Sequence, residues 1–256
     1  MKLVKKFIFE LQELSFLIWD SLYGLRKSPR YPAEVIRQMD VIGVGSLPIV
    51  LLTGFFTGGV LVLQLYPTLE FYTVQSETGR SVATTLVREL GPVLTALMVS
   101  GRIGSSIAAE LGSMVVSQQI EAMRALGSDP SRKLVAPRIL ALILLLPLLT
   151  VGADLVGITG GGVVASTIYN QDLAIYMASV WSGISTKDVI GGVIKPIVFG
   201  LIIGSIACYK GLSTRGGTVG VGKATTSAVV LSSIWVIIFD FFLSKFLQTA
   251  LDNYDI

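Results

Sequence analysis

The stretch Val41–Leu65, VIGVGSLPIVLLTGFFTGGVLVLQL, decides the fold, because no charged residue occurs between Asp40 and Glu70. A helix needs about 20 mainly apolar residues to cross the hydrocarbon core of a bilayer. Inside that core every backbone N–H and C=O must be bonded within the protein, which a helix achieves by itself. The stretch therefore predicts a membrane-spanning helix.

Four further stretches are long and apolar enough to span a membrane. They run from about Leu86 to Val116, from Ile139 to about Ile168, from Val189 to Tyr209, and from Ala224 to about Leu251. We therefore predict an all-α integral membrane protein of about five transmembrane helices.

The composition excludes most soluble classes of protein. Hydrophobic residues make up 52% of the chain and charged residues only 14%, whereas soluble domains carry roughly 25% charged residues. Histidine is absent and Cys208 is the one cysteine, so no imidazole base, thiolate metal site or disulfide can be built. We expect no cofactor, no bound metal and no catalytic residues.

The distribution of Lys and Arg predicts the orientation. Fourteen fall in the N-terminal segment and in the second-to-third and fourth-to-fifth connections, against three in the connections of the opposite side. Cytoplasmic connections carry the excess of positive charge. We therefore expect a cytoplasmic N-terminus and an external C-terminal tail, and the basic charge indicates topology rather than nucleic-acid binding.

Residues 1–40 are predicted to be an amphipathic region that precedes the membrane domain, residues 41–256. Apolar residues recur there at helical spacing: Val4, Phe7, Leu11, Leu14, Ile18, Leu22 and Leu25. Such a helix lies in the cytoplasmic interface of the membrane or packs against the bundle, and the pattern leaves both placements open.

The connection at about 117–127 is predicted to be a short cytoplasmic helix. Ser117 is positioned to cap its start, and Gly127 suits the left-handed conformation that follows a helix end. Ile120, Met123 and Leu126 form an apolar stripe. This stripe either folds back on the bundle or inserts into the groove of a soluble partner.

Two glycine-rich features have structural explanations. Residues 217–224 nearly match a phosphate-binding loop, but Ala224 replaces the required hydroxyl residue and a spanning helix precedes the motif. We interpret it as a flexible cytoplasmic loop. Glycines inside the spans, such as Gly200 and Gly204, predict close helix packing, although Gly160–Gly162 also allows a hinge.

Charged residues within the spans are the candidate functional residues. Asp154 and Asp240 lie roughly 24 Å from the cytoplasmic ends of their helices, and Arg88, Glu89 and Lys195 also fall in the outer half of the membrane. Intramembrane charges mark pathways or ion pairs. Lys195 could pair with Asp154 or Asp240, or the group could line a site for a polar head group. Arg102 and Glu110 are too far apart along one helix to pair with each other.

Several sequence blocks resemble the MlaE/YrbE permease family. They are Arg88-Glu-Leu-Gly-Pro-Val-Leu-Thr-Ala-Leu97, Ser100-Gly-Arg-Ile-Gly-Ser105, Ala109-Glu-Leu-Gly-Ser-Met114, Gln119-Ile-Glu-Ala-Met123 and Leu126-Gly-Ser-Asp-Pro130. The resemblance extends from about Arg37 to the segment that follows Asp240 and implies an ABC-exporter-like permease domain.

The resemblance implies the permease of an ABC transporter that moves phospholipid between the inner and outer membranes of a bacterium. Implied partners are a second copy in a homodimer, a cytoplasmic ABC ATPase, an MCE-domain protein and a STAS-domain protein. The implied location is the inner membrane, with the C-terminus in the periplasm. The chain would contain no ATPase motif of its own and would not be an enzyme.

The resemblance also implies site residues. The substrate-binding residues are Arg88, Glu89, Leu61, Leu69, Tyr72, Lys195 and Asp240. The residues that couple to the ATPase are Gln119, Ile120, Glu121, Met123 and Leu126. Arg88 and Lys195 would attract the lipid phosphate.

Three other functions stay open from the residues alone. An ion-coupled secondary transporter would use Asp154, Asp240 and Lys195 as a relay. An intramembrane enzyme without histidine would need a Ser–Lys pair or a carboxylate pair, and no serine lies convincingly beside Lys195. A structural scaffold for a lipid-transfer complex is the third.

Overall fold

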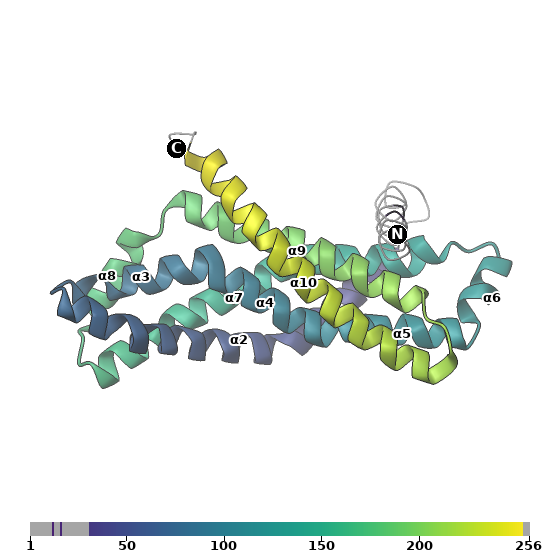
Figure 1. Cartoon of the computed structure of the whole chain (residues 1–256), viewed down its shortest axis with the longest axis horizontal. Helices are drawn as coiled ribbons and strands as arrows, with labels where there is room; N and C mark the ends of the chain where they lie inside the picture. The colour runs from purple at the N-terminus through teal and green to yellow at the C-terminus, as the bar shows by residue number, and fades with distance from the viewer. Residues whose placement is uncertain (1–11, 13–15, 17–30, 253–256) are drawn as a thin grey trace, which may run out of the picture. The chain divides into compact units, whose positions relative to one another are not determined.

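A computed structural model describes residues 31–252 together with Gln12 and Phe16. The predicted amphipathic helix, with Val4 to Leu25 as its apolar residues, lies outside the described residues. The main helices are α2 (Pro32–Phe71), α3 (Thr78–Thr85), α4 (Gly91–Val99), α5 (Ser105–Val116), α6 (Gln119–Ala125), α7 (Ala136–Ile168), α8 (Leu173–Gly183), α9 (Thr186–Leu212) and α10 (Gly217–Asp252) (Figure 1).

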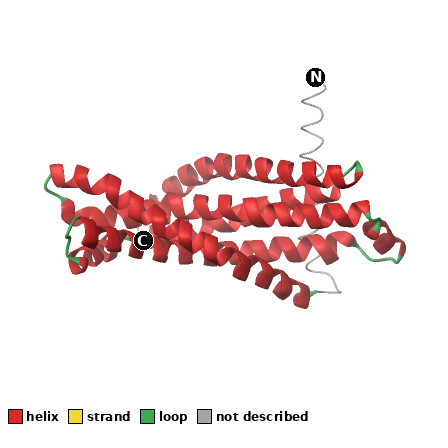
Figure 2. Cartoon of the chain, turned by 90° about the horizontal axis from the view of Figure 1, so that it is seen from below, coloured by secondary structure: helices red, strands yellow, loops and turns green. Residues whose placement is uncertain are grey.

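The prediction of an all-α membrane protein with about five spans is confirmed. Five helical segments are long and apolar enough to cross a membrane: Pro32–Phe71, Gln75–Val116, Ser131–Ile168, Thr186–Leu212 and Gly217–Ala250. The described part of the chain consists of helices joined by short loops, without a strand (Figure 2). Large apolar side chains such as Leu52, Phe56 and Leu148 are exposed along these helices, as expected where hydrocarbon replaces water.

One local prediction is wrong, and one helix was not predicted. Residues 217–223 form the first turns of α10 rather than a flexible loop. The conformational freedom of glycine is needed in the turn that leads into α10, because Gly216 and Gly217 both have positive φ. The sequence also gave no indication of α8, because its 11 residues are too few to span a bilayer.

The second span is a succession of helical pieces. Two π-helical turns, η2 (Leu86–Leu90) and η3 (Ser100–Gly104), separate α3, α4 and α5, while a short 3₁₀ turn (Gln75–Glu77) precedes α3. A π turn places one extra residue in a helical turn and is frequent at functional sites. Arg88 and Glu89 belong to η2.

The described residues pack into two compact units. The first unit comprises residues 31–43, 99–145 and 199–236, and the second comprises 44–98, 146–198 and 237–252. In the second unit, α3 lies beside α8 (Figure 1), and Tyr176 of α8 is fully buried with Val82 and Leu86 in its core. The Tyr176 hydroxyl donates a hydrogen bond to the Ile158 carbonyl at 3.2 Å.

Glycines bring α2 and α7 into backbone contact within the second unit. A Cβ atom at Gly58 would overlap the carbonyl oxygen of Gly157, and one at Gly54 would lie 2.5 Å from that of Ala153. Helix α7 continues without interruption through Gly160–Gly162, where Gly160 lies against the backbone of Phe55. Close packing, rather than a hinge, therefore explains these glycines.

The first unit contains a similar contact and a buried ion pair. The predicted packing of Gly200 and Gly204 is confirmed, because α9 meets α7 there: a Cβ at Gly200 would lie 2.7 Å from the Leu142 carbonyl oxygen. Arg138 is 1% exposed, and its guanidinium lies 2.7 Å from the half-exposed carboxylate of Glu110. Glu110 therefore pairs with a residue of another helix, as expected, because Arg102 lies too far along its own helix to reach it.

Candidate lipid-binding site

The π turn η2 arises from the sequence Arg88-Glu-Leu-Gly-Pro92. Pro92 has no N–H, so the carbonyl of Arg88, four residues earlier, loses its helical donor. The Gly91 N–H bonds instead to the carbonyl of Leu86, five residues before it. The ammonium group of Lys195 donates to the free Arg88 carbonyl at 2.7 Å. The lysine of α9 thus satisfies the backbone group that the proline exposes.

Lys195 also binds two carboxylates. Its Nζ lies 2.7 Å from Glu89 Oε2 and 3.2 Å from Asp240 Oδ1, and its side chain is only 3% exposed. Ser244 of α10 donates a further hydrogen bond to Glu89 at 3.1 Å. Of the two pairings that the sequence left open for Lys195, the structure shows the one with Asp240 and adds one with Glu89. A buried ammonium group requires such acceptors.

Arg88 pairs with Asp188, a residue that the sequence analysis missed. The Nε of Arg88 donates to Asp188 Oδ1, and the Asp188 side chain is 4% exposed while that of Arg88 is 59% exposed. Ser185 and Asp188 form a capping box: the Ser185 N–H donates to the Asp188 carboxylate at 2.9 Å and the Asp188 N–H to the Ser185 hydroxyl at 3.3 Å. The pattern Ser-x-x-Asp before an apolar run could have revealed it.

A cavity of about 440 Å³ opens beside these ion pairs. It lies within the second unit and receives side chains from η2, the start of α9 and the end of α10. Its polar lining includes Arg88, Glu89, Lys187, Asp188, Lys195, Ser244, Lys245 and Gln248. The volume falls within the range of small-molecule sites.

An apolar groove is also lined in part by this π turn. Its volume is about 570 Å³, and it is lined by Leu52, Thr53, Phe56, Thr57, Val60, Leu61, Gln64, Leu90 and Leu94. Leu90 directly follows Glu89 in η2, so this one helical turn contributes side chains both to the polar cavity and to the apolar groove. Leu61 therefore lies in a surface suited to an acyl chain.

The structure does not bring every predicted site residue into these two spaces. Leu69 lies near the end of α2 and is partly buried, and Tyr72 directly follows α2 and is exposed. Neither of them, nor Asp240, lines the cavity or the groove. Glu89 and Asp240 do come together on Lys195 as an ionic cluster, to which Arg88 contributes its backbone carbonyl.

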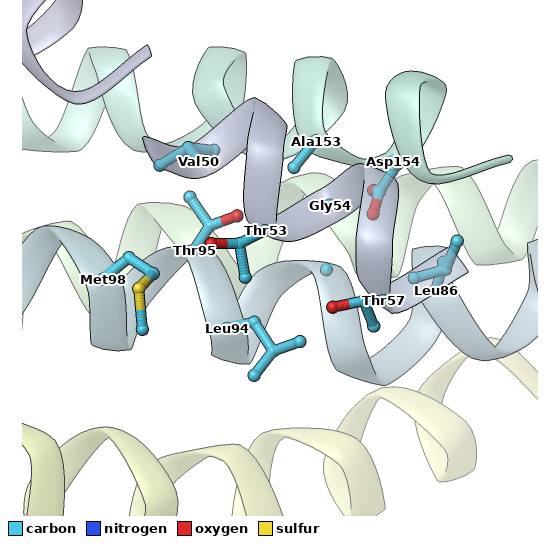
Figure 3. Close-up of a pocket in the computed structure, with 11 residues that line it drawn as sticks. Val50, Thr53, Gly54, Thr57, Leu86, Leu94, Thr95, Met98, Ala153 and Asp154 are labelled. Carbon is cyan, nitrogen blue, oxygen red and sulfur yellow. The ribbon is translucent and has the colours of Figure 1, made fainter. Parts of the chain in front are cut away.

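Asp154 is separate from that cluster. Asp154 is 7% exposed, and its Oδ1 has no hydrogen-bond partner among the described residues. It lies in a small pocket with the hydroxyl groups of Thr53, Thr57 and Thr95 (Figure 3). The pairing of Lys195 with Asp154 that the sequence allowed is therefore absent among the described residues.

The short helix α6 and Leu126, the residue that caps its C-terminal end, contain the predicted coupling residues. Ser117 does not cap it: the Ser117 hydroxyl bonds back to the Ser113 carbonyl at 2.9 Å, and Gln118, in a left-handed conformation, precedes the helix. The end is as predicted, with Gly127 at φ +74° and the Gly127 and Ser128 N–H groups bonded to Arg124 and Met123. Ile120 is 4% exposed and Leu126 is 83% exposed, while Gln119 and Glu121 are exposed and Met123 is half-buried.

Five membrane-spanning helices with a buried ionic cluster, a polar cavity and an apolar groove define an α-helical, multi-pass membrane protein with an amphiphilic site. The family profile described as Permease MlaE matches residues 35–246. The chain belongs to the MlaE permease family.

Relatives in three lineages agree with this assignment. A probable ABC transporter permease protein of Rickettsia typhi is 42% identical, covering 89% of this chain and 88% of the relative. The intermembrane phospholipid transport system permease protein MlaE of Haemophilus influenzae is 34% identical, covering 97% and 96%. The chloroplast protein trigalactosyldiacylglycerol 1 of Arabidopsis thaliana is 39% identical, covering 83% of this chain and 61% of the relative.

Proposed function

We propose that the chain is the transmembrane permease subunit of an ABC transporter that moves phospholipids between the inner and outer membranes. The observation that carries the proposal is that η2 contributes side chains both to a charged cavity and to an apolar groove. A phospholipid has the same division between a polar head group and acyl chains. The family, and the phospholipid system named for the Haemophilus influenzae relative, support the same substrate class.

The proposed site uses the predicted residues in two groups. Arg88, Glu89 and Lys195 form the polar wall beside the head group, and Asp240 supports that wall through its ion pair with Lys195. Leu61 contacts an acyl chain in the groove, and Leu69 and Tyr72 contact chains near the end of α2. Tyr72 is 66% exposed, so a second copy of the chain could share that space in the proposed homodimer.

The proposed mechanism is mechanical. A separate cytoplasmic ABC ATPase binds α6 through the exposed part of its apolar stripe, and closure of the ATPase moves the helices that line the lipid site. An MCE-domain protein receives or delivers lipid on the periplasmic side, and a STAS-domain protein attaches to the ATPase. In this arrangement the chain resides in the bacterial inner membrane, with its N-terminus in the cytoplasm and its C-terminus in the periplasm.

An ion-coupled secondary transporter is the alternative, and the geometry gives it less support. Its relay would join Asp154 to Lys195 and Asp240. Within residues 31–252, Lys195 is bound to Glu89 and Asp240, while Asp154 Oδ1 has no hydrogen-bond partner. No chain of polar contacts links the two groups among those residues.

Affinity purification in mild detergent distinguishes these functions. We expect an ABC ATPase and phospholipid in the eluate, identified by mass spectrometry, and ATP-dependent lipid movement after reconstitution in vesicles. A protein that purifies without an ATPase and transports solute under an ion gradient would contradict the proposal.

A further inference from the structure

The ion pairs beside the polar cavity have no excess of positive charge. Arg88 is neutralised by Asp188, and the single charge of Lys195 faces two carboxylates, Glu89 and Asp240. The paired set therefore has one more acid than base. Opposite charges attract and like charges repel at this range, so this set alone would disfavour an anionic ligand.

Two other lysines line the same cavity without such partners. Lys187 belongs to the first turn of α9 and Lys245 to α10. Among the residues that the structure describes, neither makes an ion pair. Lys187 is partly buried and Lys245 is exposed. When both lysines are added to the paired set, which includes Asp240, bases outnumber acids by one.

The start of α9 adds to the positive potential. Helix dipoles place a partial positive charge at the N-terminus, which falls off within the first turn. Lys187 lies in this turn, beside Ser185, which also lines the cavity. A flexible ammonium group at this position can reach an anion inside the cavity without breaking an existing ion pair.

We infer that Lys187 and Lys245 bind the phosphate of the lipid head group, and that Lys195 is a structural ion pair. This assignment rests on the proposed lipid-transport function and deepens it. It moves the main phosphate contact from Arg88 and Lys195, which the family resemblance implied, to the lysines whose charge is available. The remaining N–H groups of Arg88, whose side chain is 59% exposed, can add to the contact.

The test measures lipid bound to the purified full-length protein with and without these two charges. Wild type and the double variant Lys187→Gln, Lys245→Gln are incubated in mixed micelles with phosphatidylglycerol or with diacylglycerol, which lacks the phosphate. Bound lipid is quantified after gel filtration. We expect the variant to bind phosphatidylglycerol about fivefold more weakly, the effect of two partly exposed charge contacts, and to bind diacylglycerol as wild type does.

Two matched variants separate charge from other effects. Lys133→Gln, Lys223→Gln removes the same charge at exposed sites outside the cavity and is expected to bind as wild type. Lys187→Arg, Lys245→Arg keeps the charge and is expected to retain phosphatidylglycerol. Loss of binding in this arginine variant would overturn the assignment.

The remaining outcomes separate this inference from the proposed function. Wild-type binding of phosphatidylglycerol by the glutamine variant would overturn the lysine assignment while the lipid function stands. Absence of both lipids from wild type would overturn the proposed function and the assignment with it. Tight retention of inorganic phosphate by wild type in equilibrium dialysis would show a site for the free anion and overturn the lipid assignment.

Discussion

At the scale of single residues, the site depends on which groups lack an ordinary partner. Pro92 deprives the Arg88 carbonyl of its helical donor, and the Lys195 ammonium group supplies one at 2.7 Å. A buried carbonyl without a partner would be costly. Lys195 consequently holds both the backbone of η2 and the carboxylates of Glu89 and Asp240.

Gly91 and Asp154 form a second, independent contact in this region. A Cβ atom at Gly91 would overlap Asp154 Oδ1, so we expect Gly91→Ala to destabilise the protein by about 1–3 kcal/mol, a cost typical of overpacking. Asp154→Ala removes a buried carboxylate whose Oδ1 is unpartnered among the described residues, so we expect no loss of stability from it. The thermal midpoint in detergent measures both effects.

The double variant makes this prediction specific. Gly91→Ala combined with Asp154→Ala is expected to recover most of the lost stability, because the clash is removed. Gly101→Ala is the matched control, since a Cβ there meets nothing within 4 Å. Additive losses in the double variant would show that Gly91 is needed for another reason.

The residues of the site differ in how far the sequence predicts them. Family motifs identify Arg88, Glu89, Lys195 and Asp240, and in the structure the Lys195 ammonium group contacts the other three, Arg88 through its backbone carbonyl. Their pairing depends on contacts between helices far apart in the chain, which the sequence pattern does not specify. Asp188 was missed although the local Ser185–Asp188 capping box is visible in the sequence.

At the scale of helices, hydrophobic length predicts the spans well and their interruptions poorly. The five apolar stretches all appear as helices, because a bilayer requires long, internally bonded segments. Helix α8 and the π turns depend on other causes: α8 packs on α3, and η2 follows from Pro92. Neither cause shows in the hydropathy from which the spans are predicted, although Pro92 itself is visible in the sequence.

The glycine contact between α2 and α7 predicts a large effect of one methyl group. Gly58→Ala places a Cβ against the Gly157 carbonyl, and backbone cannot move aside as a side chain does. We expect a loss of about 3 kcal/mol, at the upper end of overpacking costs, seen as a lower thermal midpoint.

The matched control for Gly58 lies on the same helix. A Cβ at Gly43 would meet only the Leu145 side chain, at 3.5 Å, which is ordinary van der Waals contact. Gly43→Ala is therefore expected to leave the midpoint nearly unchanged. Equal losses in the two variants would show that helix propensity or glycine content, rather than the close approach to α7, governs stability here.

At the scale of the whole molecule, the proposed function requires that α6 transmit force from a separate ATPase. The predicted stripe divides into two parts: Ile120 is buried, while Leu126 is 83% exposed. The buried residue ties the helix to its own chain, and the exposed one is available to a partner. The reading in which the stripe folds back on the bundle therefore applies to Ile120, while insertion into a partner's groove stays a prediction that concerns Leu126.

Leu126→Ser tests this division in the assembled complex. Burying a leucine in a partner's groove contributes about 1.5–3 kcal/mol, so its loss is expected to weaken binding of the ATPase roughly tenfold or more. The measurement is the amount of ATPase that co-purifies per permease, with the thermal midpoint of the permease unchanged. Leu148→Ser is the control, because Leu148 is also well exposed, at 65%, but lies in α7, and it is expected to retain the ATPase. Undiminished co-purification of the ATPase with Leu126→Ser would mean that Leu126 takes no part in the contact. Reduced co-purification with both variants would mean that the loss of exposed apolar surface, rather than the position at the end of α6, weakens the complex.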